Sequence, residues 1–244
     1  MMNEIKFCVS MSTIPSRVKN IYKTLDNIKK QTKQPEKIYL NIPSKYRRFK
    51  DQTISEEDLI NLKRENLIIK RCDDFGPGTK IMGSIEEVRK YDCVIIIDDD
   101  HLYDERMFSI FIEEFSKSRN NYSFYLNKIF SIKIAQCADG FLINSNLLEN
   151  IENFYTKFVK DNNIMFMDDD LWLAIFLQKV KKSKIVNLIE IFKNRTNKDI
   201  VYTQHENFKK DGLHLTVHKP NILLNRRKIQ KIEYLKFLLN NLIK

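Results

Sequence analysis

Residues 94–103, VIIIDDDHLY, decide the fold of this chain. Four aliphatic residues in a row predict a buried strand, and three aspartates follow it directly. Like charges this close repel one another, and carboxylates are costly to remove from water unless a positive charge compensates them. The segment therefore predicts either a strand that ends in a solvated acidic turn or a strand that delivers carboxylates to a divalent cation.

The first half of the chain alternates between strand-like and helical patterns. Strands are expected at residues 5–13, 36–43, 67–71 and 93–97, and helices at 17–31, 81–90 and 106–117. This alternation predicts an α/β fold with a mostly parallel central sheet flanked by helices. Ligands of such sheets bind beyond the carboxyl ends of the strands, so the loops at 12–17, 72–80 and 98–101 are expected at one edge.

The second half is less regular and predicts a small antiparallel portion beside the main sheet. Strand-like segments are expected at 122–134 and 185–192, helices at 147–159, 168–179 and 226–244, and a loop at 194–213. The last helix is basic and amphipathic. We expect one domain over residues 1–225, with the helix at 226–244 packed on it or extending from it.

The composition of the 244 residues sets further bounds. The net charge of +10 favours phosphate-bearing or polyanionic partners, although a general preference for Lys, Asn and Ile explains it equally well. Four scattered cysteines without a C-x-x-C pair predict reduced thiols. The apolar runs are too short for a signal peptide or a membrane span, so we expect a cytoplasmic protein. The charge and the last helix still allow peripheral contact with a membrane.

The aspartates of VIIIDDDHLY form a D-x-D pattern. Alternate residues of a strand face the same way, so Asp98 and Asp100 are expected to point together and Asp99 to point away. Carboxylate oxygens suit Mg²⁺ or Mn²⁺, which also bind the phosphates of a substrate. His101 is interpreted as a surface residue, which is the commoner fate of a single histidine.

Two loops carry residues suited to a phosphate-bearing ligand. In RCDDFGPGTK, Pro77 between two glycines enforces a sharp turn, with Asp74 before it and Lys80 at the start of a helix, where anions are favoured. In STIPSR, Thr13 and Arg17 follow the first strand and are suited to a nucleotide. An ordinary turn and an ordinary helix cap remain the alternative interpretations.

A third acidic segment, MDDDLWLA, begins the helix predicted at 168–179. Acids in the first turn are favoured by the helix dipole alone, but a carboxylate there also suits a general base. Successive helical residues are turned by ~100°, so at most one of the three carboxylates is aimed at a given acceptor.

Together and in this order, these motifs resemble the GT-A glycosyltransferases over residues 5–176. The resemblance rests on STIPSR, DFGPGTK, IIIDDDH, ADGFLI and DDDLWLA. It is closest to the small glycosyltransferase domains of large DNA viruses and bacteria. It implies a nucleotide-sugar donor, a UDP-sugar in first place, with Mn²⁺ or Mg²⁺ between its diphosphate and the D-x-D, and a glycan, polypeptide or lipid-linked acceptor.

The resemblance also implies roles for particular residues. The donor would be held by Thr13, Arg17, Asp74, Lys80, Asp98, Asp99 and Asp139, with Asp139 at the sugar hydroxyls. The metal would be bound by Asp100 and Asp98, with His218 of HLTVHKP as a further ligand and His214 as its alternative. In inverting members an acid ahead of the long helix deprotonates the acceptor, which favours Asp170 and then Asp169.

Two other classes of protein fit part of the sequence. Nucleotidyltransferases that make activated sugars also use metal-binding acids on an α/β sheet, but they carry a glycine-rich phosphate loop, and STIPSR has no glycine. A nucleic-acid-binding protein would explain the charge of +10, but not the acidic edge, since carboxylates repel a phosphate backbone. We therefore expect no nucleic-acid partner.

Overall fold

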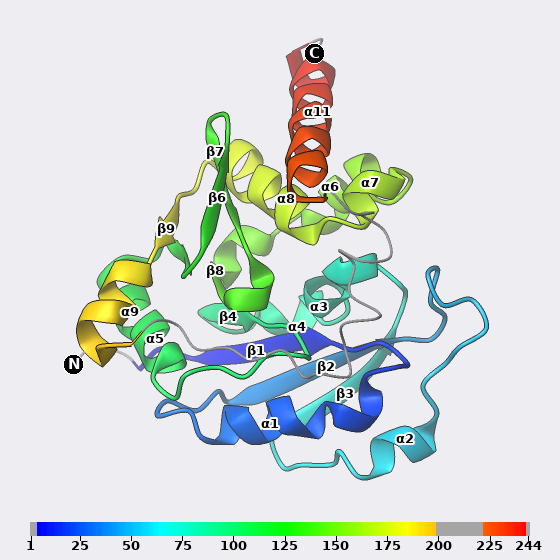
Figure 1. The fold of residues 1–244 in the computed structure, drawn as a ribbon, viewed down its shortest axis with the longest axis vertical. Helices are drawn as coiled ribbons and strands as arrows, with labels where there is room; N and C mark the ends of the chain where they lie inside the picture. Colours follow the sequence, from blue (N-terminus) through cyan, green and yellow to red (C-terminus); the bar gives the residue numbers. More distant parts are fainter. Residues whose placement is uncertain (1–3, 199–221, 243–244) are drawn as a thin grey trace.

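The structure, a computed structural model, describes residues 4–198 and 222–242. Within these residues the chain forms a mixed sheet of seven strands in the order β3-β2-β1-β4-β8-β5-β9 (Figure 1). The strands are β1 (Phe7–Ser12), β2 (Lys37–Pro43), β3 (Leu67–Cys72), β4 (Cys93–Ile96), β5 (Asn121–Ser123), β8 (Phe141–Asn144) and β9 (Ile185–Asn187). Strands β3, β2, β1 and β4 are parallel, and β8 runs antiparallel to β4 and β5. The prediction of a mostly parallel α/β sheet is confirmed.

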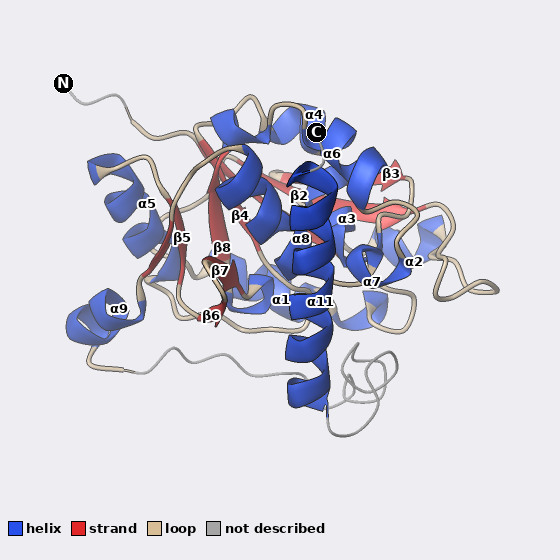
Figure 2. Ribbon diagram, turned by 90° about the horizontal axis from the view of Figure 1, so that it is seen from above, coloured by secondary structure: helices blue, strands red, loops and turns tan. Residues whose placement is uncertain are grey.

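Helices cover both faces of the sheet (Figures 1 and 2). One face packs against α1 (Tyr22–Lys29), α2 (Glu56–Ile60), α5 (Met107–Lys117) and α9 (Ile189–Thr196). The other packs against α3 (Thr79–Met82), α4 (Ile85–Val88), α6 (Ile151–Phe158), α7 (Asn163–Phe166), α8 (Asp169–Ile175) and the last helix, α11 (Ile222–Leu242). Two hydrophobic cores result, and the sheet separates them.

Strand β4 lies in the middle of the sheet and belongs to both cores. Val94 and Ile96 face one core and Ile95 faces the other, as the period of a strand requires. Parallel pairing with β1 places residues 98–100 beside the loop that follows β1. Antiparallel pairing with β8 brings the start of β8, and the ADG segment before it, to the same edge.

A second, two-stranded sheet supplies the antiparallel portion that the sequence predicted. It is the hairpin of β6 (Leu126–Ile129) and β7 (Ile132–Ala135), which lies near α8 and α11 (Figure 1). The Tyr234 hydroxyl on α11 lies 3.1 Å from the Ser131 hydroxyl at the hairpin turn. The hairpin and α11 are thereby joined although about a hundred residues separate them in the sequence.

Several sequence predictions need correction at the level of elements. The strand predicted at 185–192 is wrong in its second half, because β9 ends at Asn187 and α9 begins at Ile189. The Asn187 side chain accepts a hydrogen bond from the Ile189 amide at 2.8 Å, which satisfies the first amide of the helix. The last helix begins at Ile222, before the predicted position 226. His214 and His218 lie outside the described residues.

Two general properties follow from the same residues. All four cysteines are free thiols, as predicted. The helices in the described part of the chain are too short or too polar to cross a lipid bilayer.

Candidate active site and metal site

The D-x-D segment brings three metal-ligating side chains together beyond the end of β4. Asp98, Asp100 and His101 each offer a ligand atom, and these atoms lie within 4.8 Å of one another. Two carboxylates and an imidazole suit Mn²⁺ and also accommodate Mg²⁺. The prediction that Asp98 and Asp100 point together agrees with this arrangement.

Asp99 is not among the grouped ligand atoms and is held by the loop after β1. The Thr13 hydroxyl donates to Asp99 Oδ2 at 2.6 Å, and Arg17 donates to Asp99 Oδ1 at 2.8 Å. Arg17 also lies 2.9 Å from Asp100. Thr13 and Arg17 therefore meet the D-x-D segment, and in the structure their partners are its carboxylates.

His101 is where the sequence interpretation was wrong. The side chain is buried, not on the surface, and its Nδ1 lies 2.8 Å from Asp100 Oδ1. Burial alone would lower the pKa of His101, but the hydrogen bond with Asp100 and the charge of Asp98 raise it. The sequence feature that could have indicated its place in the site is the position of His101 directly after the aspartate triplet.

The G-P-G turn has a conformation that its glycines make possible. Gly76 has φ +62°, and a Cβ there would lie 2.5 Å from the Phe166 carbonyl oxygen. A Cβ on Gly78 would lie 2.6 Å from the Trp172 ring. Asp74 fixes the turn from the other side, because its carboxylate accepts hydrogen bonds from the amides of Gly76 at 2.8 Å and Arg47 at 2.6 Å. The turn is thus packed directly against α7 and α8.

This packing aims Lys80 at two acidic segments. The buried ammonium of Lys80 pairs with Asp98 and lies 3.2 Å from Asp169 Oδ2. Burial would lower the pKa of Lys80, but Asp169 and Asp98 raise it well above its usual range. Lys80 is therefore a fixed cation between the D-x-D segment and the start of α8.

The three acids at the start of α8 have different sets of partners, although Asp168 and Asp170 share Arg226. Asp168 caps the helix by accepting from the Leu171 amide at 3.2 Å. It also accepts from Arg226 at 2.9 Å and Gln230 at 2.8 Å, both on α11. The divergence agrees with the ~100° turn between successive helical residues. Neither α11 residue was predicted to contact these acids.

Asp169 and Asp170 differ in how their carboxylates are engaged. Asp170 accepts from the Cys137 amide at 3.0 Å and from Arg226 at 3.1 Å. Asp169 faces Lys80. Burial raises the pKa of Asp169 to about 6, against the opposing effect of Lys80 and with a further increase from the charge of Asp170.

The ADG segment joins this group through Tyr103. The Tyr103 hydroxyl donates to the Ala138 carbonyl at 3.0 Å and accepts from the Asp98 amide at 3.1 Å. Asp139 is buried, and its charge contributes to the raised pKa of His101. The structure thus brings Asp139 to the D-x-D segment.

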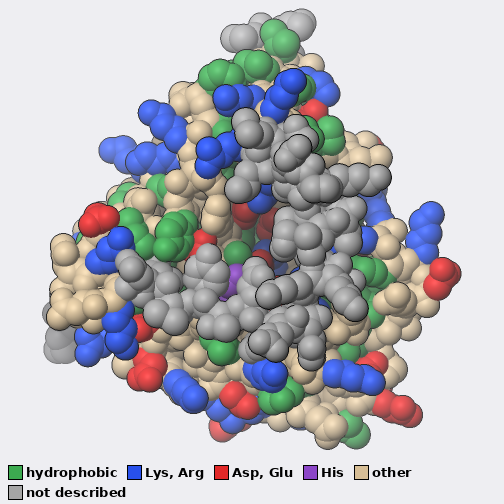
Figure 3. Space-filling model, in the orientation of Figure 1, with side chains coloured by type: hydrophobic (Ala, Val, Ile, Leu, Met, Phe, Trp, Pro, Cys, Tyr) green, Lys and Arg blue, Asp and Glu red, His purple; other side chains and the backbone are tan. Residues whose placement is uncertain are grey.

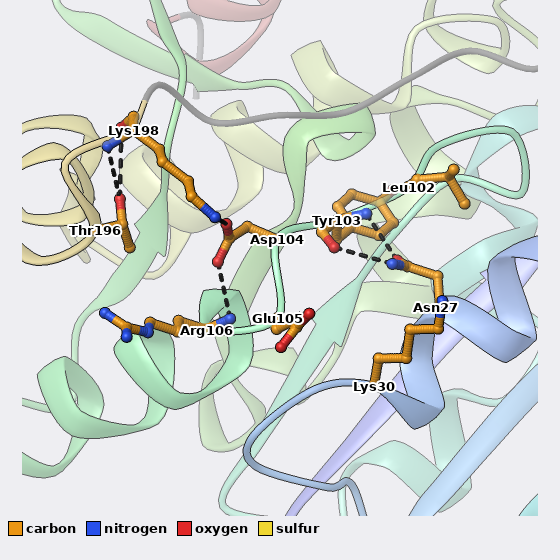
Figure 4. A pocket seen from close by; sticks show the side chains of 9 residues that line it. All are labelled: Asn27, Lys30, Leu102, Tyr103, Asp104, Glu105, Arg106, Thr196 and Lys198. Atoms are coloured by element: carbon orange, nitrogen blue, oxygen red, sulfur yellow. Dashed lines mark hydrogen bonds and ion pairs between the residues drawn. The ribbon is translucent and has the colours of Figure 1, made fainter.

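A pocket of about 540 Å³ lies next to the loop of residues 102–106, on the side of α1 (Figure 4). It is lined by Asn27, Lys30, Leu102, Tyr103, Asp104, Glu105, Arg106, Thr196 and Lys198. Tyr103 is the point at which it borders the acidic group, and none of the metal-ligating side chains lines it. We therefore do not assign it to the donor.

The site as a whole carries more negative than positive charge. Among the described residues, seven carboxylates face three permanent cations, Arg17, Lys80 and Arg226. The carboxylates are Asp98, Asp99, Asp100, Asp139, Asp168, Asp169 and Asp170. Figure 3 shows acidic side chains and a histidine at the centre of this face of the molecule. Such an excess of buried acids is stabilised by a bound cation.

Comparison with protein-family models and with curated proteins gives no match. Solved structures do match. The mannosyltransferase PcManGT from Pyrobaculum calidifontis, solved with GDP-Man and Mn²⁺, is 12% identical, and the match covers 93% of this chain and 74% of that chain with a TM-score of 0.53. The 4-diphosphocytidyl-2C-methyl-D-erythritol synthase from Anaerococcus prevotii is also 12% identical, with a TM-score of 0.50 over 75% of this chain and 86% of that chain.

A further match is TarS from S. aureus, residues 1–349. It is 13% identical with a TM-score of 0.47 over 70% of this chain, and the match spans 56% of the TarS chain. The chain described here has a GT-A type of fold, as its motifs predicted. Since a glycosyltransferase and a synthase both match, the fold does not choose between their reactions. That choice depends on the site.

Proposed function

We propose that this protein is a metal-dependent glycosyltransferase that moves a sugar from a nucleotide-diphosphate sugar to a hydroxyl group of an acceptor. The observation that carries the proposal is the position of Lys80 between Asp98 and Asp169. One buried cation joins a candidate metal site to a carboxylate with a raised pKa. This arrangement suits a diphosphate that leaves next to a base.

Charge supports the binding of a metal–diphosphate complex. Mn²⁺ or Mg²⁺ held by Asp98, Asp100 and His101 would neutralise the diphosphate and polarise its bond to the sugar. Lys80 is already fixed nearby and can stabilise charge on the departing nucleotide without rearrangement. The position of Asp139 near the D-x-D segment supports a binding position for the sugar beside this metal site. His218 remains a predicted further metal ligand.

The contacts favour Asp169 over Asp170 as the general base, which reverses the order preferred from the sequence. Asp170 already accepts hydrogen bonds from the Cys137 amide and Arg226, so its lone pairs are largely used. Burial raises the pKa of Asp169 to about 6, toward neutral pH, which suits a general base. Asp170 and Asp168 then serve to hold α8 in place.

A thermal-shift screen tests donor binding. UDP-, GDP- and CMP-sugars are compared with and without Mn²⁺, with a UDP-sugar expected to give the largest effect. Stabilisation by one nucleotide only in the presence of metal supports the proposal. The Asp98→Asn variant should lose this stabilisation, and Asp51→Asn, an exposed aspartate on the loop before α2, should keep it. Equal stabilisation of both variants would contradict the assignment.

A second candidate function is nucleotidyl transfer, because the A. prevotii synthase shares the fold. The two reactions release different products. A glycosyltransferase releases a nucleoside diphosphate from a nucleotide sugar. A nucleotidyltransferase joins the nucleotidyl group of a nucleoside triphosphate to a sugar phosphate and releases pyrophosphate. Pyrophosphate release without any turnover of nucleotide sugars would favour the second function. Glycan, polypeptide and lipid-linked hydroxyl acceptors should be tried in the assay for release of nucleoside diphosphate.

A further inference from the structure

The excess positive charge of the chain lies in three segments that meet at one end of the molecule. Residues 126–136, 176–184 and 226–240 contain eleven of the 42 Lys and Arg residues but one of the 32 acids. The remaining residues contain 31 of each, so the net charge of +10 is accounted for by these segments, here called the basic end. The charge is therefore localised, which a general preference for lysine does not explain.

Side-chain contacts hold the basic end together as one surface. Lys179 donates to the Ser131 hydroxyl at 2.9 Å, and Gln178 donates to the Lys133 carbonyl at 2.6 Å. The Arg227 guanidinium donates to the Asn127 side chain at 3.2 Å. Figure 3 shows Lys and Arg side chains gathered over the end where Figure 1 places the β6–β7 hairpin and α11.

The basic end also exposes apolar side chains in a regular stripe. Ile232, Leu235 and Leu239 of α11 are 44%, 46% and 58% exposed, and their spacing places them on one face of the helix. The opposite face of α11 packs on the protein through Tyr234 and Phe237. The helix is thus apolar on two faces, and one of them has no partner among the described residues.

Basic side chains flank this apolar stripe. Lys228, Lys231 and Lys236 are exposed on the same helix. Phe130, at the turn of the hairpin, is 52% exposed, and the Lys231 ammonium lies 5.9 Å from its ring centre. Apolar side chains between lysines are the pattern of a helix that lies in the surface of an anionic bilayer.

We propose that the basic end binds the surface of a membrane that contains anionic lipids, with the stripe of α11 inserted among the acyl chains. A second copy of the chain fits this face less well, because pairing would bring two strongly positive surfaces together. A nucleic acid would use the lysines but would leave Ile232, Leu235 and Leu239 without a role. The proposal does not depend on the proposed transfer reaction.

The same helix connects the lipid-binding face to the acids of α8. Arg226 contacts Asp168 and Asp170, and Leu239 lies thirteen positions further along α11. At about 1.5 Å per residue the two are roughly 20 Å apart along the helix axis. Membrane binding would therefore hold the candidate active site close to the lipid surface, where acceptors attached to lipids are found.

Vesicle sedimentation tests the proposal. The protein is mixed with vesicles of phosphatidylcholine alone or of equal parts phosphatidylcholine and phosphatidylglycerol, at low and high salt. Binding is expected to the anionic vesicles only and should weaken as salt rises. Leu235→Ser/Leu239→Ser should weaken it on the order of thirtyfold, from the apolar area that two half-exposed leucines bury in lipid. The matched control is Tyr22→Ser/Ile60→Ser, which removes side chains 43% and 60% exposed on α1 and α2.

Each other outcome overturns the proposal. The first such outcome is that the protein does not bind anionic vesicles, and the second is that it binds neutral vesicles equally well. The third is that the control variant loses as much binding as Leu235→Ser/Leu239→Ser. A change from dimer to monomer in the Leu235→Ser/Leu239→Ser variant, without lipid binding by the parent, would make the stripe an interface between copies. Tighter binding to a single-stranded oligonucleotide than to vesicles, unaffected by the leucine substitutions, would make the basic end a nucleic-acid site. Donor-induced thermal shifts of all variants show separately whether the transfer proposal holds.

Discussion

The substitution Asp169→Asn tests the proposed general base most directly. Asparagine keeps the shape of the side chain but cannot accept a proton. General-base catalysis contributes ~10²–10⁴-fold, so kcat should fall by about that factor. Donor affinity should change little, because the predicted metal ligands and Lys80 remain in place. Asp170→Asn is the matched comparison and should cost less, since Asp170 is engaged with Cys137 and Arg226.

The raised pKa of Asp169 gives this prediction a second measurable consequence. Burial and the neighbouring acids Asp170, Asp98 and Asp168 raise the pKa to about 6, and Lys80 opposes them. Below this pH the carboxyl group is protonated and cannot act as a base, so activity should rise with pH through this range and then level off. At pH 5 about one tenth of the molecules carry the ionised form, so kcat/KM for the donor should be roughly tenfold below its plateau.

The assay is the release of nucleoside diphosphate from the nucleotide sugar that gives the largest thermal shift, measured between pH 5 and pH 8 in the presence of Mn²⁺. Asp169→Asn should remove the acidic limb of the profile as well as lower its plateau. A large loss in Asp170→Asn together with a normal Asp169→Asn enzyme would refute the assignment. Persistence of the acidic limb in Asp169→Asn would show that the limb belongs to another group.

Three further predictions concern the metal site and the loops around it. Asp100→Asn should abolish the Mn²⁺-dependent part of donor binding while the fold survives, as measured by titration with nucleotide and by circular dichroism; unchanged binding would remove Asp100 from the metal site. Lys80→Met should lower the free energy of unfolding by about 3–5 kcal/mol, because it leaves buried carboxylates without a cation. Lys70→Met, at a partly exposed pair with Glu87, should cost below about 1 kcal/mol. Urea denaturation measures both, and similar costs would contradict the argument. Asp74→Ala should weaken binding of free UDP or GDP as much as binding of the full donor, and a loss confined to the sugar portion would place this loop outside the nucleotide site.

The sequence predicted those parts of the site that depend on local order along the chain. An aliphatic run must be buried, and the residues that follow it must emerge at the end of a strand, so the position of Asp98 and Asp100 follows from the pattern alone. The same reasoning brought the loops after β1 and β3 to this edge. It could not show which carboxylates Arg17 and Lys80 contact, because those pairings depend on side-chain packing across the sheet.

Contacts that depend on distant segments were not predicted. Arg226 lies 58 residues from Asp168 in the sequence, and only the packing of α11 brings the two together. His101 was placed on the surface because a single histidine is more often exposed, and its position directly after the aspartate triplet was given no weight. Residues 185–192 were predicted as a strand because the run is short and apolar, whereas the chain turns after Asn187 and α9 begins at Ile189.

The three acids at the start of α8 make the site tolerant of some changes and intolerant of others. Asp169 contacts Lys80, whereas Asp168 and Asp170 share Arg226. Asp168 also contacts Gln230 and Asp170 the Cys137 amide, so a substitution at one position leaves the contacts of the other two in place. An insertion or deletion of one residue ahead of Asp168 would instead rotate all three side chains by ~100° at once. In a library of active variants, the length of the stretch between Phe166 and Leu171 should therefore be fixed more strictly than the identity of Met167, Asp168 or Asp170, whereas Asp169 should be retained as the proposed base.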